Sequence, residues 1–151
     1  MRRLAILPLA IVLAAAATAG ADTPARRLVF ASRTEAGSTG FIDLASVHEV
    51  DGRREALTVL VLPGHPMRGA PSHVLARVTV DCGKNLSRGL SLQTFDSEDR
   101  PLGDPQVFDR DLGPMEPETH DLICGGPGAP SDPRVFPNPA AAAQWARTGG
   151  V

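Results

Sequence analysis

Four histidines are the residues of this 151-residue chain with the widest chemical repertoire: His48, His65, His73 and His120. A zinc enzyme places histidines in pairs at helical spacing, as in H-E-x-x-H, or sets a carboxylate partner in register with them. His48 is followed by a glutamate but lacks the second histidine, and His65 and His73 only flank a proline-rich loop. The spacing predicts no metal site and favours loop histidines that are exposed or hydrogen-bonded.

Serine and carboxylate chemistry has no recognisable pattern either. The chain contains no G-x-S-x-G elbow, and a set made of Ser72, His73 and Asp81 is one that any chain of this length would allow. Glycosidase chemistry needs two carboxyls beside a deep cleft that is usually aromatic, and this chain has one tryptophan and no tyrosine. The carboxylate pairs are Asp43 with Glu49, Glu98 with Asp99, and Asp109 with Asp111. The sequence therefore contains no recognisable catalytic motif and indicates no cofactor.

Ion- and phosphate-binding loops are the next candidates. The acidic run Asp96–Asp104 departs from the EF-hand pattern, because Pro101 stands where the sixth loop position requires glycine. Gly125–Gly128 lies in a proline-rich segment and does not open a helix after a strand, as a phosphate loop would. We expect a solvated turn at the acidic run and a loop or tail at Gly125–Gly128. The basic pairs Arg26-Arg27 and Arg53-Arg54 are interpreted as solvated residues, with a partner-binding patch as the alternative.

The first 21 residues have the three-part layout of a secretory signal peptide. Arg2 and Arg3 precede the apolar run Leu4–Ala17, and small residues at Ala19 and Ala21 suit a signal peptidase. That run is too short for a membrane-spanning helix, which needs about 20 residues. Cleavage after Ala21, or after Ala19, would give a periplasmic or secreted protein without a membrane span. The predicted organisation is a signal peptide (1–21), a β-rich domain (22–124) and a Pro/Gly-rich tail with a short helix (125–151).

The charge of the predicted mature chain limits its partners. Without Arg2 and Arg3 it has 13 basic and 17 acidic residues, a net charge of −4. An acidic domain has no general attraction to nucleic acid or to anionic lipid. The partner expected for such an exported protein is an envelope or extracellular macromolecule.

Cys82 and Cys124 are the only cysteines. An even pair in an oxidising compartment is most simply a structural disulfide. A redox dithiol and a metal site are the alternatives, but there is no C-x-x-C motif, and two thiols without nearby histidines make a poor zinc site.

Short strands separated by turns predict a mainly β (α+β) fold with a single antiparallel sheet of about six strands. Residues 73–81 alternate most regularly, and Asp51-Gly52 is a strong hairpin signal. Ala45–Val50 is expected to form either a helical turn or a bent strand. The predicted strands are Leu28–Ser32, Phe41–Leu44, Glu55–Leu62, His73–Asp81, Gly89–Phe95, Gln106–Phe108 and His120–Cys124.

One helix is expected near the C-terminus. Asn138 is a good N-cap, Pro139 suits the first helical position, and Gly149 ends the predicted helix Ala140–Thr148. A helix of this length is marginal alone in water, so it requires Trp145 to dock against the domain; the alternative is a frayed tail.

The order of these elements resembles the surface-adhesin E-like family of small exported bacterial proteins. The resemblance covers about residues 28–124 and rests on short motifs, including an aromatic followed by I-D-L-x-S-V and a V-x-Y-D-C-like stretch. Family members often have a tryptophan in the first strand and a tyrosine before the D-C pair, where this chain has Val29 or Phe30 and Val80. The matching pieces are Leu28–Ser32, Gly40–Val47, Asp51-Gly52, Glu55–Leu62, Val78–Cys82, Asp99–Gly103 and Ile123-Cys124.

The resemblance implies an antiparallel sheet, a disulfide between Cys82 and Cys124, a place outside the cytoplasm and no catalysis. It transfers no binding residue. The function expected is therefore a non-enzymatic exported domain that acts by binding, through an edge strand or an apolar sheet face. A small periplasmic hydrolase with a site built from His73, His120 and nearby carboxylates is one alternative. A structural envelope component or an inhibitor is the other.

Overall fold

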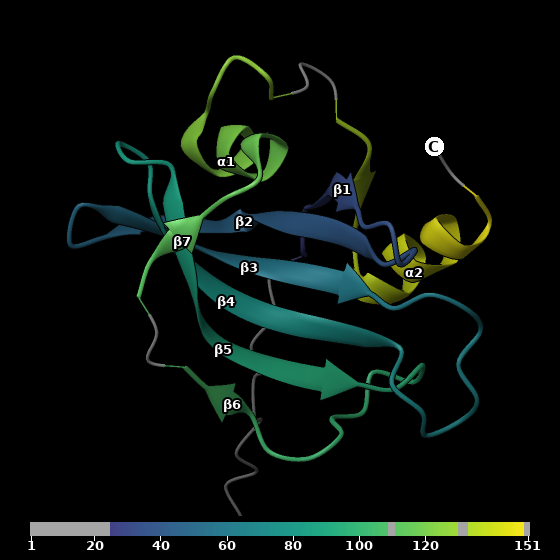
Figure 1. Cartoon of the computed structure of the whole chain (residues 1–151). Helices are drawn as coiled ribbons and strands as arrows, with labels where there is room; N and C mark the ends of the chain where they lie inside the picture. The colour runs from purple at the N-terminus through teal and green to yellow at the C-terminus, as the bar shows by residue number, and fades with distance from the viewer. Residues whose placement is uncertain (1–24, 109–110, 130–132, 150–151) are drawn as a thin grey trace, which may run out of the picture.

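Five consecutive strands that pair with their neighbours in chain order form the centre of the molecule (Figure 1). The computed structural model describes residues 25–108, 111–129 and 133–149. Within them lie an eight-stranded sheet, antiparallel at every pairing, and two helices. The elements are β1 (Leu28–Arg33), β2 (Thr39–Val50), β3 (Arg53–Val61), β4 (His73–Asp81), β5 (Leu86–Phe95), β6 (Gln106–Val107), β7 (Gly113–Pro114), α1 (Pro117–Cys124), β8 (Val135–Phe136) and α2 (Pro139–Arg147).

Short strands cover parts of both edges of the sheet. The strand order is β6-β5-β4-β3-β2-β1-β8, and β7 also pairs with β5. On the other edge, Leu28 and Val29 of β1 pair with Phe136 and Val135 of β8. Two-residue edge strands leave little free backbone for pairing with another chain. An edge strand is therefore a poor docking place in this fold.

Local sequence signals explain the meander. Asp51 and Gly52 have φ values of 50° and 73°, as the tight turn between β2 and β3 requires. In β4 the alternation is the predicted one, because Leu75 pairs with Val59 whereas Val74 pairs with Leu60 on the opposite face. The alternation predicted for Gly89–Phe95 is interrupted, since a register shift inserts Leu90 between the partners of Arg77 and Val78.

The sheet has a buried core on each face, and neighbouring residues of β2 point into different cores. Phe41 packs with Leu28 and Val59 against Phe136 and the helix α2. We call this side the α2 face. The indole of Trp145 completes it, with ring centroids 5.5 Å from Phe30, 5.9 Å from Phe41 and 5.2 Å from Phe136. The C-terminal helix is therefore docked.

Ile42 points to the opposite side of the sheet, which we call the α1 face. It packs with Ala56 and Val80 against Ile123 of α1. The Cys82–Cys124 disulfide joins the end of α1 to the turn after β4, with the two Cα atoms 5.8 Å apart. The extensive contacts of the two helices with the sheet are limited to β1, β2, β3 and β8 (Figure 1). The disulfide predicted from the cysteine pair is confirmed.

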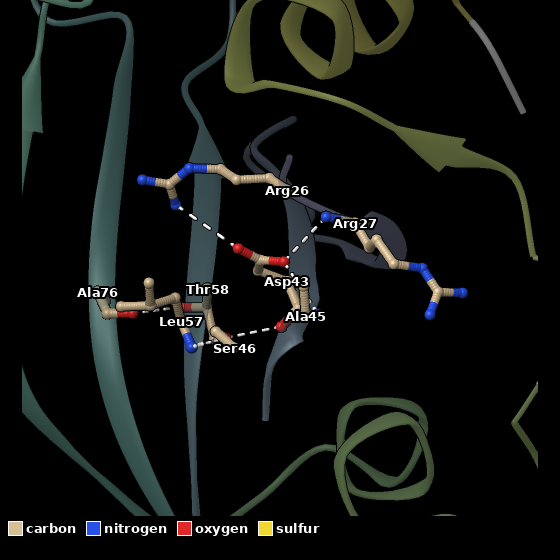
Figure 2. Close-up of polar contacts among 8 residues, drawn as sticks. All are labelled: Arg26, Arg27, Asp43, Ala45, Ser46, Leu57, Thr58 and Ala76. Carbon is tan, nitrogen blue, oxygen red and sulfur yellow. Dashed lines mark hydrogen bonds and ion pairs between the residues drawn. The ribbon is translucent and has the colours of Figure 1, made fainter. Parts of the chain in front are cut away.

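A buried carboxylate shapes the bend in β2 (Figure 2). Asp43 is 4% exposed and accepts hydrogen bonds from the backbone N–H groups of Arg27 (2.9 Å) and Ala45 (3.1 Å). Pairing with β3 breaks between Asp43 and His48, and inside this break the Ser46 hydroxyl accepts the N–H of Leu57 at 2.7 Å. The segment Ala45–Val50 is therefore a bent strand, which was one of the two predicted possibilities.

The predicted mainly β, antiparallel fold is confirmed, but one predicted strand is wrong. Residues 120–124 belong to the helix α1, which begins at Pro117 and ends at Gly125 in a left-handed conformation (φ 76°). The run H-D-L-I-C has no clear period, and Pro117 gives the preorganised φ of a first helical turn. The predicted cap of α2 is confirmed, because the Asn138 side chain accepts the N–H of Ala141 at 2.8 Å.

Neither helix in the described residues is long and apolar enough to cross a membrane. The predicted signal peptide, residues 1–21, lies outside the described residues. The segment after Cys124, predicted as a tail, supplies β8 to the sheet and α2 to the core of the α2 face.

Candidate functional site

The structure separates the residues from which a hydrolase site was considered. His73 begins β4, whereas His120 contacts the carbonyl of Cys82 (Nε2 to O, 3.2 Å), just beyond the other end of that strand. Asp81 also lies at that far end, where it accepts the N–H of Lys84 at 3.2 Å. Neither the His73–His120 pair nor the Ser72–His73–Asp81 set is therefore assembled.

Several of the remaining candidates from the sequence have structural contacts. His48 approaches the carbonyl of Ser46 at 2.8 Å, and the guanidinium of Arg54 donates to the carbonyl of Ile123, which ties β3 to α1. Arg26 lies 3.9 Å from the carboxylate of Asp43 (Figure 2). Asp109 lies outside the described residues. These contacts stabilise the fold, and they are not arranged around a common reacting atom.

The acidic turn after β5 is built around a buried carboxylate instead of an ion. Asp96 is 1% exposed and accepts the N–H groups of Glu98 (2.9 Å) and Arg100 (3.0 Å), and the Arg100 Nε at 2.9 Å. Burial would raise the pKa of Asp96, but these donors together hold it below its ordinary value. The described residues contain no group of three or more His, Cys, Asp or Glu placed to hold a metal.

A cavity of about 260 Å³, lined by both polar and apolar residues, lies between α2, the start of β4 and this acidic turn. His73 is 4% exposed, stacks on Phe95 with a centroid distance of 5.2 Å, and places Nε2 3.4 Å from the carboxylate of Asp99. On the other wall, the guanidinium of Arg147 donates to the Ser72 hydroxyl at 2.7 Å. Ser72 contacts Arg147 whereas His73 contacts Asp99, so the two side chains do not form a nucleophile–base pair.

Burial keeps the imidazole in this cavity neutral. Desolvation lowers the pKa of His73 below its ordinary value of 6.5, the Asp99 carboxylate opposes this shift, and Arg147 reinforces it. The side chain therefore acts as a neutral hydrogen-bonding group at pH 7.

A longer, mainly apolar groove of about 320 Å³ runs along the α1 face. Its floor crosses from Ala31 of β1 to Ser87 of β5, and its wall is the segment from Pro114 to Thr119 that leads into α1. Strands lie about 4.8 Å apart, so crossing five of them spans about 19 Å. Among the residues that the structure describes, Glu116 is the single ionisable one that lines the groove.

The groove continues into an uncovered part of the same face. Leu60 of β3, Val74 and Ala76 of β4, and Leu92 of β5 share this face through the pairs Leu60–Val74 and Ala76–Leu92. All four are only partly buried. In the described part of the chain, neither helix reaches across β4 and β5 (Figure 1). The α1 groove and this apolar strip form one continuous candidate binding surface.

Sequence reasoning missed most residues of this surface. The period-two pattern of residues 73–81 shows that Val74 and Ala76 share a face, but it does not show which face a helix covers. The wall was missed because no helix was predicted to begin at Pro117, and His120–Cys124 was predicted to be a strand. A proline followed by a glutamate at residues 117 and 118 was the available signal for the start of a helix.

Comparison with known proteins adds no relative from which a role could be transferred. No protein-family model, no curated protein and no solved structure matches this chain.

Proposed function

We propose that this chain is a non-enzymatic binding protein that holds an extended apolar segment of a partner protein in the groove of its α1 face. One observation carries the proposal: considering the described residues alone, the groove is lined by a single ionisable side chain and opens onto an uncovered apolar strip. Ligand sites are typically concave and mostly apolar, with a few polar groups that orient the ligand. An active site would instead need titratable groups within reach of one reacting atom.

The dimensions and chemistry of the groove favour a peptide. An extended chain rises about 3.3 Å per residue, so about six residues span the five strands. Side chains of Leu60, Val78 and Met115 offer apolar contacts. The Thr119 hydroxyl offers a hydrogen bond to a peptide backbone, and the Thr58 hydroxyl, which donates to the carbonyl of Ala76, can still accept one. An acyl chain has no groups that could form hydrogen bonds with the hydroxyls.

The resemblance to surface-adhesin E-like proteins and the disulfide support a setting outside the cytoplasm, in the periplasm or beyond the cell. The partner would then be an envelope or extracellular protein. Short strands cover parts of both edges of the sheet. Binding of a partner on the α1 face is therefore favoured over addition of a partner strand at an edge.

The test is selection of peptides from a random 12-residue library on the immobilised full chain, followed by amide chemical-shift mapping. We expect apolar-rich peptides that shift the amides of Thr58, Leu60 and Met115. Leu60→Glu should weaken binding at least tenfold, because a buried charge would face the peptide. Val107→Glu, which changes an 81% exposed apolar residue on β6, should leave binding unchanged. Failure to select any peptide, shifts confined to the other face, or cleavage of the peptide would refute the proposal.

A further inference from the structure

The cavity beside α2 differs from the groove of the α1 face, because residues of opposite charge lie on its two walls. Arg147 comes from the last turn of α2, and Asp99 comes from the acidic turn after β5. Within the described residues the Asp99 carboxylate contacts His73, and the Arg147 guanidinium contacts Ser72. The two charges therefore face the same space without neutralising each other in an ion pair.

We propose that this cavity binds a small zwitterion, an α-amino acid, with its carboxylate toward Arg147 and Ser72 and its ammonium toward Asp99.

The deeper wall suits the carboxylate. The Nε of Arg147 is buried and has no hydrogen-bond partner among the described residues. A buried donor of a charged group is costly unless it is paired. The guanidinium has several donors in a planar fork that matches a carboxylate, and the Ser72 hydroxyl beside it offers one more hydrogen-bonding group. Ser72 is 2% exposed, so this wall is shielded from water.

The mouth suits the ammonium. The side chain of Asp99 is 53% exposed, so its carboxylate stands near the opening. The buried imidazole of His73 holds one carboxylate oxygen at 3.4 Å and thereby orients the group. His73 is itself fixed by its stacking on Phe95, with an angle of 5° between the rings. A cavity of about 260 Å³ admits a small ligand and not a large one.

This site is separate from the proposed peptide groove. His73 shares the α2 face with Leu75, whereas the groove residue Leu60 pairs with Val74 on the α1 face. The two sites can therefore be tested independently, and the Leu60→Glu variant should keep its binding of amino acids.

The test is an amide chemical-shift titration of the full chain with glycine and L-alanine, compared with propionate and ethylammonium. Each analogue retains one of the two charged groups of alanine. We expect the amino acids to shift the amides of Ser72, Asp99 and Gln144 saturably, and each analogue to bind at least about tenfold more weakly, because it leaves one charged wall unpaired. Equal binding of propionate would mean a simple anion site. Equal binding of ethylammonium, or no saturable shift with either amino acid, would equally overturn the proposal.

Two variants remove one charge each. Asp99→Asn retains a residue type that tolerates the positive φ of 58° at this position, and Arg147→Gln retains a polar side chain. Both should lose binding of L-alanine by about tenfold or more, whereas Arg134→Gln, in an exposed position, should bind as the wild type does. Circular dichroism checks that each variant folds. If Arg147→Gln does not fold, the binding of L-alanine by Asp99→Asn, which changes a residue at the exposed mouth, tests the proposal. Unchanged binding in a folded Asp99→Asn protein would contradict the proposal.

Discussion

The hydroxyl of Ser46 accepts the backbone N–H of Leu57 at 2.7 Å, at the break in the β2–β3 pairing that follows the pair Asp43–Leu57. The same hydroxyl donates to the carbonyl of Asp43 at 2.6 Å (Figure 2). One serine thus closes the gap that the bend in β2 opens. The I-D-L-x-S-V motif of this chain therefore has a structural explanation, since its aspartate and serine hold the bend.

Ser46→Ala should lower the free energy of unfolding by roughly 1–3 kcal/mol, because it leaves the N–H of Leu57 without an acceptor. Urea unfolding measures the loss, and hydrogen exchange should show faster exchange of the Leu57 amide. Glu49→Ala, at an exposed position of the same strand, should change stability by no more than about 0.5 kcal/mol. A Ser46→Ala protein as stable as the control would show that the bend needs no such acceptor.

Reduction of the Cys82–Cys124 bond should cost about 4 kcal/mol of stability, because the bond closes a loop of 42 residues in the unfolded chain. Urea unfolding with and without dithiothreitol measures this difference. The double variant Cys82→Ser/Cys124→Ser should match the reduced wild type and should not respond to the reductant. Equal stability of the oxidised and reduced proteins would rule out the disulfide as a stabiliser of α1.

Gly126→Ala should destabilise the protein by roughly 1–3 kcal/mol. A Cβ at Gly126 would overlap the carboxylate of Asp121, whose other oxygen accepts the N–H of Gly128 at 2.8 Å. The short aspartate side chain cannot move aside without losing that hydrogen bond. Gly113→Ala is the matched control, because a Cβ there meets no atom within 4 Å. Thermal unfolding of both variants decides, and a similar melting temperature for the two would contradict the expectation.

Stability should fall in mild acid through His73. Burial lowers the pKa of His73 in the folded state, so below the ordinary value of 6.5 the unfolded chain takes up a proton that the folded protein does not. The free energy of unfolding therefore declines as the pH falls from 6.5 toward the lowered value, and this contribution is constant above 6.5.

Urea unfolding of His73→Gln at pH 7.5 and pH 5.5 measures this contribution. The variant should lose less stability between the two pH values than the wild type does. His65→Gln, which changes an exposed histidine of the neighbouring loop, should behave as the wild type does. An identical decline in His73→Gln would assign the acid sensitivity to other groups.

Features that depend on a few neighbouring residues could be predicted from the sequence. The hairpin at Asp51-Gly52, the alternation of β4 and the cap at Asn138 follow from backbone preferences or from a single side chain. The disulfide could be predicted because there were only two cysteines to join. None of these signals requires knowledge of the fold.

Features that join distant segments could not be predicted. Arg147 reaches Ser72 across 75 positions, and Arg77 pairs with Glu55 across 22. No local sequence pattern predicts either contact. The helix α1 was not predicted for a related reason. Its buried residue, Ile123, is buried by contacts with the distant residues Ile42 and Ala56, and the eight residues of the helix show no apolar periodicity that would indicate it. The two candidate sites lie where such long-range contacts meet.

The pairing of β1 with β8 has a consequence for how the protein is made. β1 leaves the ribosome before β2 to β7 and β8 leaves after them, yet β1 and β8 are neighbours in the sheet. The aromatic core around Phe41 and Trp145 cannot close until α2 has been synthesised. Nascent polypeptides that are released early would therefore expose this core, and a circular permutant that joins the region of β8 directly to β1 should fold with a shorter delay.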